Sequence, residues 1–138
     1  MEETSPVHDE MKRFLAEQLK PAWDVFVTWS ADHLIKYGPD HELEHNLRIL
    51  SPSDFGFHNA IKRPNGQIVF IDFEYFGWDD PAKMISDYLL HPAQDLNEDL
   101  RQRFFDGCLD SFADWPGVSS RMDLVYPLCG LKWCLLLL

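Results

Sequence analysis

Two carboxylates and one carboxamide near the middle of the chain have the types and the spacing of a metal-assisted group-transfer site. Asp54 and Asn59 lie five residues apart in the segment SPSDFGFHN, and Asp72 follows 18 residues after Asp54. Mg²⁺ prefers hard oxygen ligands, often taking one or two from protein and the rest from phosphates and water. Asn59 and Asp72 supply such oxygens, which leaves Asp54 to accept a proton from an attacking hydroxyl or to orient it.

A β-hairpin is predicted between these groups, and it would bring them together. The runs at 60–63 and 68–71 are rich in β-prone residues, and Pro64-Asn65-Gly66 separates them. An Asn-Gly turn between two such runs is a strong hairpin signal. Because a two-stranded hairpin returns the chain to the end where it began, we expect Asp72 beside the loop that carries Asp54.

A long helical segment is predicted before this loop. Thr4-Ser5-Pro6 combines a hydroxyl N-cap with proline at the first helical position, and apolar residues then recur at helical spacing. Pro21 is expected to start a second helix, so the segment is either a helical hairpin or one kinked helix, closed by residues 36–39. Residues 47–50 are a short strand candidate.

Three more helices are predicted after the hairpin, preceded by a loop at 72–78. Their expected starts are Asp79 or Asp80 followed by Pro81, then Asp95, and then about Ser119. The layout predicts a mainly helical α+β fold with one small embedded hairpin, forming a single domain over residues 1–138.

Composition and charge narrow the class of protein. The formal net charge of −11 repels phosphate backbones, so nucleic-acid binding is not expected. The three cysteines form no CxxC pair and indicate a reducing compartment, and the polar N-terminus shows no secretory signal. The apolar ending PLCGLKWCLLLL is shorter than the roughly 20 residues that span a bilayer. A cytoplasmic protein without membrane contact is therefore predicted.

The same ending bears on the completeness of the chain. A helix that stops at LLLL has no C-cap glycine, no basic last turn and no polar tail. We therefore expect the chain to be part of a longer protein.

Two sequence blocks carry a family resemblance. Residues 52–59 read PSDFGFHN, and residues 71–88 read IDFEYFGWDDPAKMISDY. They are similar to the patterns H-G-D-x-x-x-x-N and I-D-F/W-E-x-x-x-x-G-D-P-x-x-D-L of the aminoglycoside phosphotransferase (APH) family, whose relatives include choline kinases and fructosamine kinases. The chain resembles the C-terminal catalytic lobe of this family, which has a protein-kinase-like fold.

The resemblance implies a phosphotransferase that moves the γ-phosphoryl group of ATP or GTP to a small-molecule hydroxyl with Mg²⁺. It implies that Asp54 is the catalytic base and that Asn59 and Asp72 bind the metal and, through it, the nucleotide. Supporting roles are implied for four further residues: His58, Glu74, Asp80 and Asp87. The letters Asp54-Phe55-Gly56 match the kinase metal triplet by spelling alone, and its counterpart is Asp72-Phe73-Glu74.

The chain also departs from the family pattern. Pro52 stands where the family has a histidine two residues before the base, and Gly56 replaces a second histidine. No glycine-rich phosphate loop and no strand lysine precede Asp54, so an N-terminal nucleotide lobe is not encoded before it. The expected partner is that missing lobe, or a second copy joined through exposed apolar surface.

Other interpretations stay open. A non-catalytic, pseudokinase-like remnant or interaction module is one alternative. The segment His41-Glu42-Leu43-Glu44-His45 matches the HExxH motif of zinc hydrolases, which requires a helix, and Gly38-Pro39 and Pro52 leave at most two turns for it. A solvated connector is therefore favoured there. His58 either acts on Asp54 or a phosphate, or packs on the hairpin, whereas His8, His33 and His91 are expected to be isolated.

Overall fold

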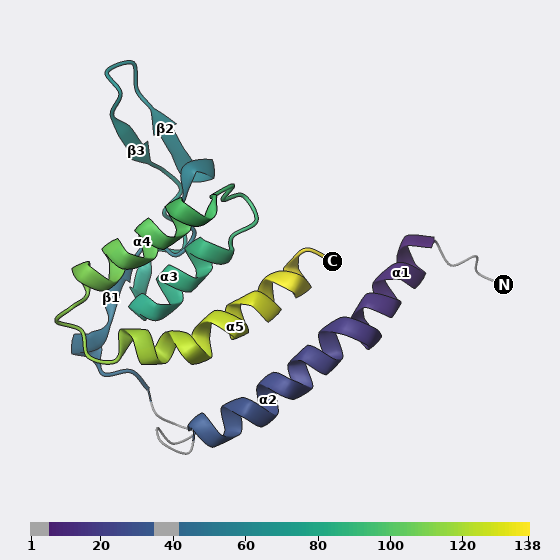
Figure 1. Ribbon diagram of the computed structural model, residues 1–138. Helices are drawn as coiled ribbons and strands as arrows, with labels where there is room; N and C mark the ends of the chain where they lie inside the picture. Colours follow the sequence, from purple (N-terminus) through teal and green to yellow (C-terminus); the bar gives the residue numbers. More distant parts are fainter. Residues whose placement is uncertain (1–5, 35–41) are drawn as a thin grey trace. The chain divides into compact units, whose positions relative to one another are not determined.

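A computed structural model describes residues 6–34 and 42–138, and these residues form helices and two small antiparallel sheets (Figure 1). The predicted mainly helical α+β class is confirmed. The chain divides into two compact units, Glu42–Cys129 and a second unit of Met1–His41 with Gly130–Leu138. The single domain over 1–138 stays a prediction. Among the described residues, no helix has the length and apolarity needed to cross a membrane.

The N-terminal helices form one continuous helical run: α1 at Pro6–Phe14, a π-helical segment at Leu15–Leu19 and α2 at Lys20–Leu34. Of the two predicted arrangements, a helical hairpin or one kinked helix, the described residues form a single run, and α2 begins at Lys20, directly before Pro21. Proline lacks an N–H and crowds the carbonyl four residues earlier. A π-helical turn before Pro21 accommodates this disruption, and in it the Lys20 N–H donates to the Leu15 carbonyl five residues earlier. The predicted closure at 36–39 lies outside the described residues.

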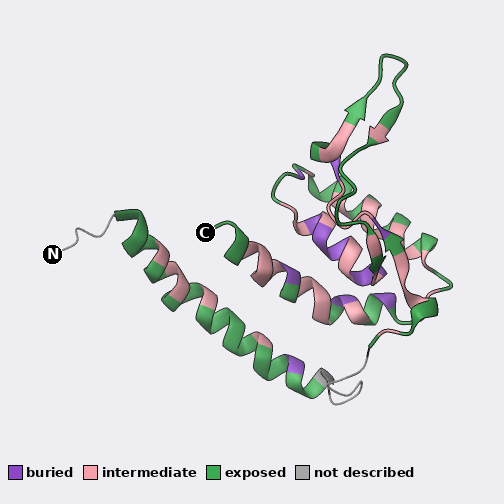
Figure 2. Cartoon of the chain, turned by 180° about the vertical axis from the view of Figure 1, so that it is seen from behind, coloured by how far each residue is buried: buried purple, intermediate pink, exposed green. Residues whose placement is uncertain are grey.

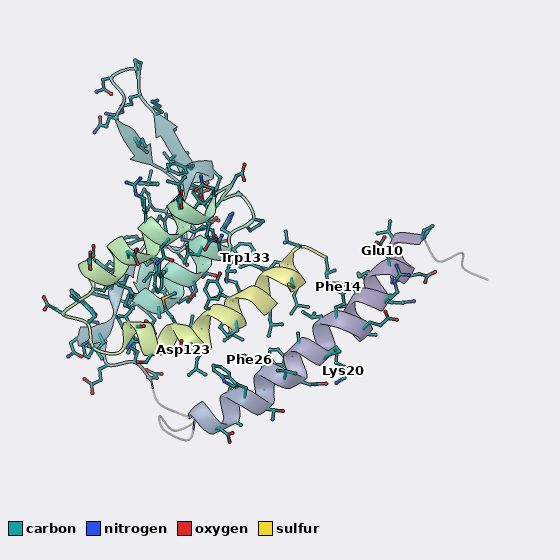
Figure 3. All side chains as sticks on the ribbon, viewed as in Figure 1. Glu10, Phe14, Lys20, Phe26, Asp123 and Trp133 are labelled. Carbon is teal, nitrogen blue, oxygen red and sulfur yellow. The ribbon has the colours of Figure 1, made fainter. Side chains whose placement is uncertain are left out.

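The side chains along this run include an aromatic row on α2. Phe26, labelled in Figure 3, lies with its ring centroid 6.2 Å from that of Trp23 and 6.1 Å from that of Trp29. Lys20 and Asp24 form an exposed ion pair at 2.6 Å. Exposed pairs of this kind add about 0.5 kcal/mol or less, so packing must supply most of the stability of α2.

The predicted hairpin is confirmed. Strand β2 (Ala60–Lys62) pairs antiparallel with β3 (Ile68–Phe70), with Ile61 opposite Val69. In its turn the Gly66 N–H donates to the Arg63 carbonyl at 2.9 Å, and Gly66 has φ +85°, which favours glycine. Pro64-Asn65-Gly66 therefore builds the reversal for which its residue types are suited.

A second two-stranded sheet was not predicted in full. Strand β1 (Ile49–Ser51) overlaps the expected strand at 47–50 and ends one residue later. It pairs antiparallel with β4 (Gly77–Asp79), with Leu50 opposite Trp78. The prediction of a loop over 72–78 is therefore wrong for its last two residues, which belong to β4. A three-residue strand whose partner lies far back in the sequence leaves no local periodicity to read.

The remaining helices are α3 (Pro81–Leu90), α4 (Glu98–Ser111) and α5 (Val118–Leu136). Asp80 caps α3, since its side chain accepts from the Ala82 N–H, as the Asp-Pro pattern predicts. Helix α4 starts later than expected, because Asn97 rather than Asp95 accepts from the N–H of Leu100. Helix α5 begins within one residue of the predicted position.

The core of the Glu42–Cys129 unit is built around α3, whose buried residues are purple in Figure 2. The buried cluster comprises Ala82, Ile85, Leu89, Val118 and Met122. Aromatic rings extend it: Tyr88 stacks on Phe104 with centroids 4.0 Å apart and on Phe55 with centroids 5.0 Å apart. Because Phe55 follows Asp54 directly, this stack ties the Asp54 loop to the core.

Candidate functional site

The loop that carries Asp54 is held in a strained conformation. Ser53, immediately before Asp54, has φ +64°, and its N–H donates to the Ser51 hydroxyl at 3.0 Å. The Asp54 N–H donates to the Pro52 carbonyl at 2.8 Å. A non-glycine residue at positive φ costs on the order of 1 kcal/mol and persists only where its surroundings enforce it.

Asn59 and Asp72 both lie next to this loop. The Asn59 amide Nδ2 donates to the Asp54 carbonyl at 2.9 Å and lies 3.5 Å from Asp54 Oδ2. The Ile71 N–H donates to the Asn59 carbonyl at 2.9 Å, so the next residue, Asp72, begins where the hairpin returns to its start. The expectation that the hairpin brings Asp72 back to the Asp54 loop is therefore met by the backbone.

Asp72 is itself strained, with φ +63°. Among the described residues, Ser53 and Asp72 are the two non-glycine residues with positive φ, and one precedes Asp54 while the other is a predicted metal ligand. Such outliers cluster at functional sites.

Negative charge converges on Tyr75, in the segment that follows Asp72. A hydrogen bond to Glu74 and the charge of Glu74 raise the pKa of Tyr75 above its usual 10.0, and the charges of Asp72 and Asp54 add to this effect. The three carboxylates are therefore close enough to act on one phenol. Glu74 lies within this acidic group, and its supporting role stays a prediction.

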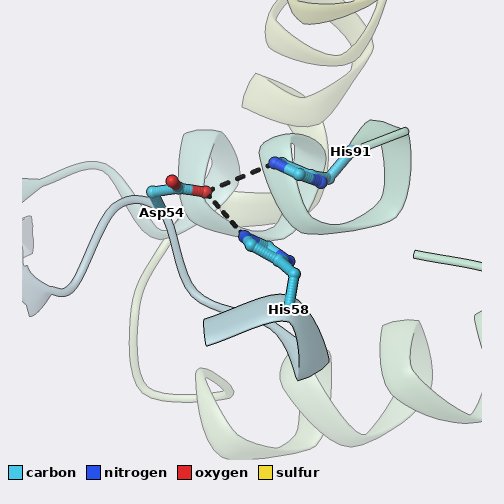
Figure 4. Close-up of side chains that lie close together, drawn as sticks. All are labelled: Asp54, His58 and His91. Atoms are coloured by element: carbon cyan, nitrogen blue, oxygen red, sulfur yellow. Dashed lines mark hydrogen bonds and ion pairs between the residues drawn. The ribbon is translucent and has the colours of Figure 1, made fainter. Parts of the chain in front are cut away.

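Two histidines hold the Asp54 carboxylate (Figure 4). The Nε2 atoms of His58 and His91 lie 3.1 Å and 3.3 Å from the same oxygen, Asp54 Oδ1. Their rings are stacked, with centroids 4.2 Å apart and planes 7° apart. Of the two interpretations left open for His58, the structure therefore has the contact with Asp54.

The prediction that His91 is isolated is wrong. It is the C-cap residue of α3, as a helix-end histidine would be, but its ring turns to the Asp54 loop. It lies 37 positions after Asp54 and belongs to no motif, so only the docking of α3 brings it there. Gln94 was missed for the same reason, and its Nε2 lies 3.4 Å from His58 Nδ1.

The acidic residues at the start of α3 have cationic partners. Asp80 forms a two-pronged ion pair with Arg121, with distances of 2.8 Å from Nε to Oδ2 and 3.1 Å from Nη2 to Oδ1. Lys83 Nζ lies 2.7 Å from Asp79 Oδ2 and 3.2 Å from Asp87 Oδ2. Asp80 and Asp87 thus shape the helix and the turn before it, as predicted.

The pKa of Lys83 reflects this setting. Burial alone would lower the pKa, but the hydrogen bond and charge of Asp79, together with Asp87, outweigh burial and raise it above its usual 10.5. Lys83 Nζ also lies 3.4 Å from the Ser53 hydroxyl, which links the start of α3 to the residue before Asp54.

Two donor sets could hold a metal. With its Nδ2 directed to Asp54, Asn59 presents Oδ1 as a ligand, and Asp72 contributes carboxylate oxygens; both suit Mg²⁺. The second set is Asp54, His58 and His91, whose ligand atoms all lie within 4.8 Å of one another. Imidazole nitrogens suit ions such as Zn²⁺.

The HExxH segment does not form the helix that a zinc hydrolase needs. Glu42–Glu44 have no helical structure, and His45 belongs to a short 3₁₀ turn, His45–Leu47. The His45 ring lies against Trp78, with centroids 4.6 Å apart. His41 lies outside the described residues.

Comparison with known proteins adds no relative: no protein-family model, curated protein or solved structure matches the chain. The resemblance of residues 52–59 and 71–88 to the APH family therefore stands on those residues alone.

Proposed function

We propose that the chain is the catalytic lobe, with a protein-kinase-like fold, of an APH-type phosphotransferase that uses ATP or GTP to phosphorylate a small-molecule hydroxyl. One observation carries the proposal: two hydrogen bonds, from Asn59 to the Asp54 carbonyl and from the Ile71 N–H to the Asn59 carbonyl, gather Asp54, Asn59 and Asp72 around the base of one hairpin. A base and two oxygen ligands are what such a reaction needs from this lobe.

In the proposed reaction Asp54 receives the proton of the acceptor hydroxyl. The hydroxyl oxygen forms a bond to the γ-phosphorus, the bond from that phosphorus to the β,γ-bridging oxygen breaks, and the nucleoside diphosphate leaves. Since Asp54 Oδ1 is occupied by the two histidines, the proton goes to Oδ2. The side chain of Asp54 is 42% exposed, so an acceptor can reach it.

The donor chemistry of Asn59 and Asp72 fits Mg²⁺, which would neutralise charge on the transferring phosphoryl group when bound. In the sequence, Asn59 precedes the hairpin and Asp72 follows it, and Asp72 has a positive φ of +63°. Together with the net charge of −11, the carboxylates around Tyr75 favour a cationic acceptor, such as an aminoglycoside or a choline-like amino alcohol.

A non-catalytic interaction module is the second candidate, and the exposed apolar surface favours it. Large apolar side chains along the two sheets and the segment between them are between 42% and 65% exposed: Leu50, Ile61, Phe70, Phe73, Tyr75 and Trp78. Such surface marks a partner interface, which in the first proposal would belong to a nucleotide lobe.

Transfer of phosphate from labelled ATP with Mg²⁺ separates the two candidates. The chain, and the longest reading frame that contains it, would be assayed with aminoglycosides, choline, sugars and amino alcohols. We expect Asp54→Asn and Asp72→Ala each to reduce turnover by about 10²- to 10⁴-fold. Asp110→Asn, an exposed change near the end of α4, is the matched control. Full turnover in Asp72→Ala would refute the metal assignment, and no transfer to any acceptor would favour the interaction module.

A further inference from the structure

The far nitrogen of each histidine at Asp54 accepts a hydrogen bond. The backbone N–H of Ala93 donates to His91 Nδ1 at 3.1 Å. The side-chain amide of Gln94 lies with Nε2 3.4 Å from His58 Nδ1, and an amide nitrogen can only donate. Both Nδ1 atoms therefore act as acceptors, although they belong to residues 33 positions apart.

These two contacts determine where the imidazole protons lie. A neutral imidazole carries one N–H, and when Nδ1 accepts, the proton must be on Nε2. Both Nε2 atoms face Asp54 Oδ1: His58 Nε2 hydrogen-bonds to this oxygen at 3.1 Å, and His91 Nε2 lies 3.3 Å from it, within ion-pair distance. The parallel stack of the rings, 4.2 Å apart, disfavours two imidazolium ions, which would repel each other at that separation.

We propose that His58 and His91 are positioning residues that, as neutral Nε2–H donors, hold Oδ1 of Asp54 and turn Oδ2 toward the acceptor. The catalytic part of this inference rests on the proposed phosphotransferase function, whereas the proton positions do not. Neutral donors orient the carboxylate without placing a full positive charge beside it. The arrangement also persists after proton transfer, since a carboxyl protonated at Oδ2 still accepts at Oδ1.

The surroundings of Gln94 support this arrangement. Gln94 is only 7% exposed, and its Oε1 is buried without a hydrogen-bond partner among the described residues. A Cβ on Gly56 would collide with the Gln94 amide, so glycine at this position leaves room for the amide to reach His58. Burying an amide whose oxygen has no hydrogen-bond partner costs free energy. The contact of Gln94 Nε2 with His58 Nδ1 is the interaction that this buried amide makes.

A metal ion on the same three residues is the competing explanation. Asp54, His58 and His91 could supply three ligand atoms. Coordination through Nε2 would require both rings to move their proton to Nδ1, where Ala93 and Gln94 already donate.

The first test is nitrogen NMR of the chain with ¹⁵N-labelled histidine, which reports the proton position on each ring without any assay of activity. We expect pyrrole-type Nε2 and pyridine-type Nδ1 signals for His58 and His91, assigned from His58→Gln and His91→Gln. An Nδ1–H form of either ring would overturn the proposal. So would added Zn²⁺ that binds one equivalent and shifts both Nε2 signals, because that result assigns a metal site.

The second test separates the donor from the ring. His91→Gln keeps an N–H near the Nε2 position, whereas His91→Phe keeps the stacked ring and removes the donor. We expect His91→Phe to lower kcat on the order of 10- to 100-fold with KM for ATP unchanged, and His91→Gln to restore most of that loss. His45→Gln, remote from Asp54, is the control variant.

The outcomes of the two tests distinguish this inference from the proposed function. Equal kcat in His91→Phe and the parent would refute the positioning role while leaving the phosphotransferase intact. If the parent transfers no phosphate at all, the proposed function fails and the catalytic role with it, but the NMR result still decides the proton positions.

Discussion

The acidic residues before and within α3 and the carboxylate in the loop before the hairpin are held by opposite kinds of partner. Asp80 is paired with Arg121, and Asp79 and Asp87 share Lys83. Asp54 is held by two imidazoles, and among the described residues no lysine or arginine forms an ion pair with it. Lys83, which pairs with Asp79 and Asp87, also lies 3.4 Å from the hydroxyl of Ser53, the residue before Asp54.

The difference lies in the charge of the partner groups. A permanent cation within about 4 Å favours the charged form of a carboxylate and so makes it a poor proton acceptor. Neutral donors fix direction without adding a full positive charge. Under the proposed function, the partner rather than the residue type therefore distinguishes the aspartates that stabilise the fold from the one that accepts a proton.

The largest expected effect is a loss of activity without a loss of stability. Asp54→Asn keeps the shape of the side chain and removes the proton acceptor, so phosphotransfer falls by about 10²- to 10⁴-fold. The free energy of unfolding, measured by urea titration, should change by less than about 1 kcal/mol, because the side chain is 42% exposed. A loss of several kcal/mol would mean that Asp54 is structural, like Asp80.

The next largest expected effect is a loss of stability at the start of α3. Asp80→Ala removes the N-cap of that helix and leaves Arg121, whose side chain is 18% exposed, without its carboxylate. We expect a loss of about 2 to 4 kcal/mol in the free energy of unfolding. Lys20→Ala, which breaks an exposed pair, is the control and should cost about 0.5 kcal/mol or less. Equal losses in both variants would contradict the assignment of Asp80 to the fold.

A smaller effect with a defined pH dependence is expected at Lys83. Its side chain is 39% exposed, so Lys83→Met should cost only about 1 to 2 kcal/mol. Because the folded-state pKa of Lys83 is raised, its contribution is complete below the usual value of 10.5 and is lost as pH rises through the raised value. The difference between parent and variant in urea titrations should therefore be constant at neutral pH and shrink above about pH 10.5. A difference that grows with pH would refute this origin.

The smallest effect concerns Tyr75, which reports the charge around the hairpin base. Its pKa lies above the usual 10.0 chiefly because of Glu74, with smaller contributions from Asp72 and Asp54. Glu74→Gln should lower the midpoint of its phenolate absorbance titration most, and Asp72→Asn and Asp54→Asn should lower it less. Tyr75→Phe identifies the signal. An unchanged midpoint in Asp54→Asn would place that carboxylate outside the acidic group.

Local sequence rules predicted the elements whose signals are local. Pro64-Asn65-Gly66 predicted the hairpin, and Asp80-Pro81 predicted α3, because turn and cap chemistry involve residues a few positions apart. Pro21 predicted the start of a second helix, and α2 begins one residue earlier, but the π-helical turn before it joins α2 to α1. Strand β4 was missed, since its partner β1 lies 28 residues earlier.

The candidate site divides in the same way. Asp54, Asn59 and Asp72 could be predicted as neighbours from the sequence, because one hairpin of fixed length joins them and must return Asp72 to the loop. The contacts of His91 with Asp54 and of Gln94 with His58 could not be predicted, nor could the pairing of Asp80 with Arg121. These contacts depend on how α3 and α5 pack on a shared core, and packing is a property of the whole set of buried side chains rather than of any short spacing.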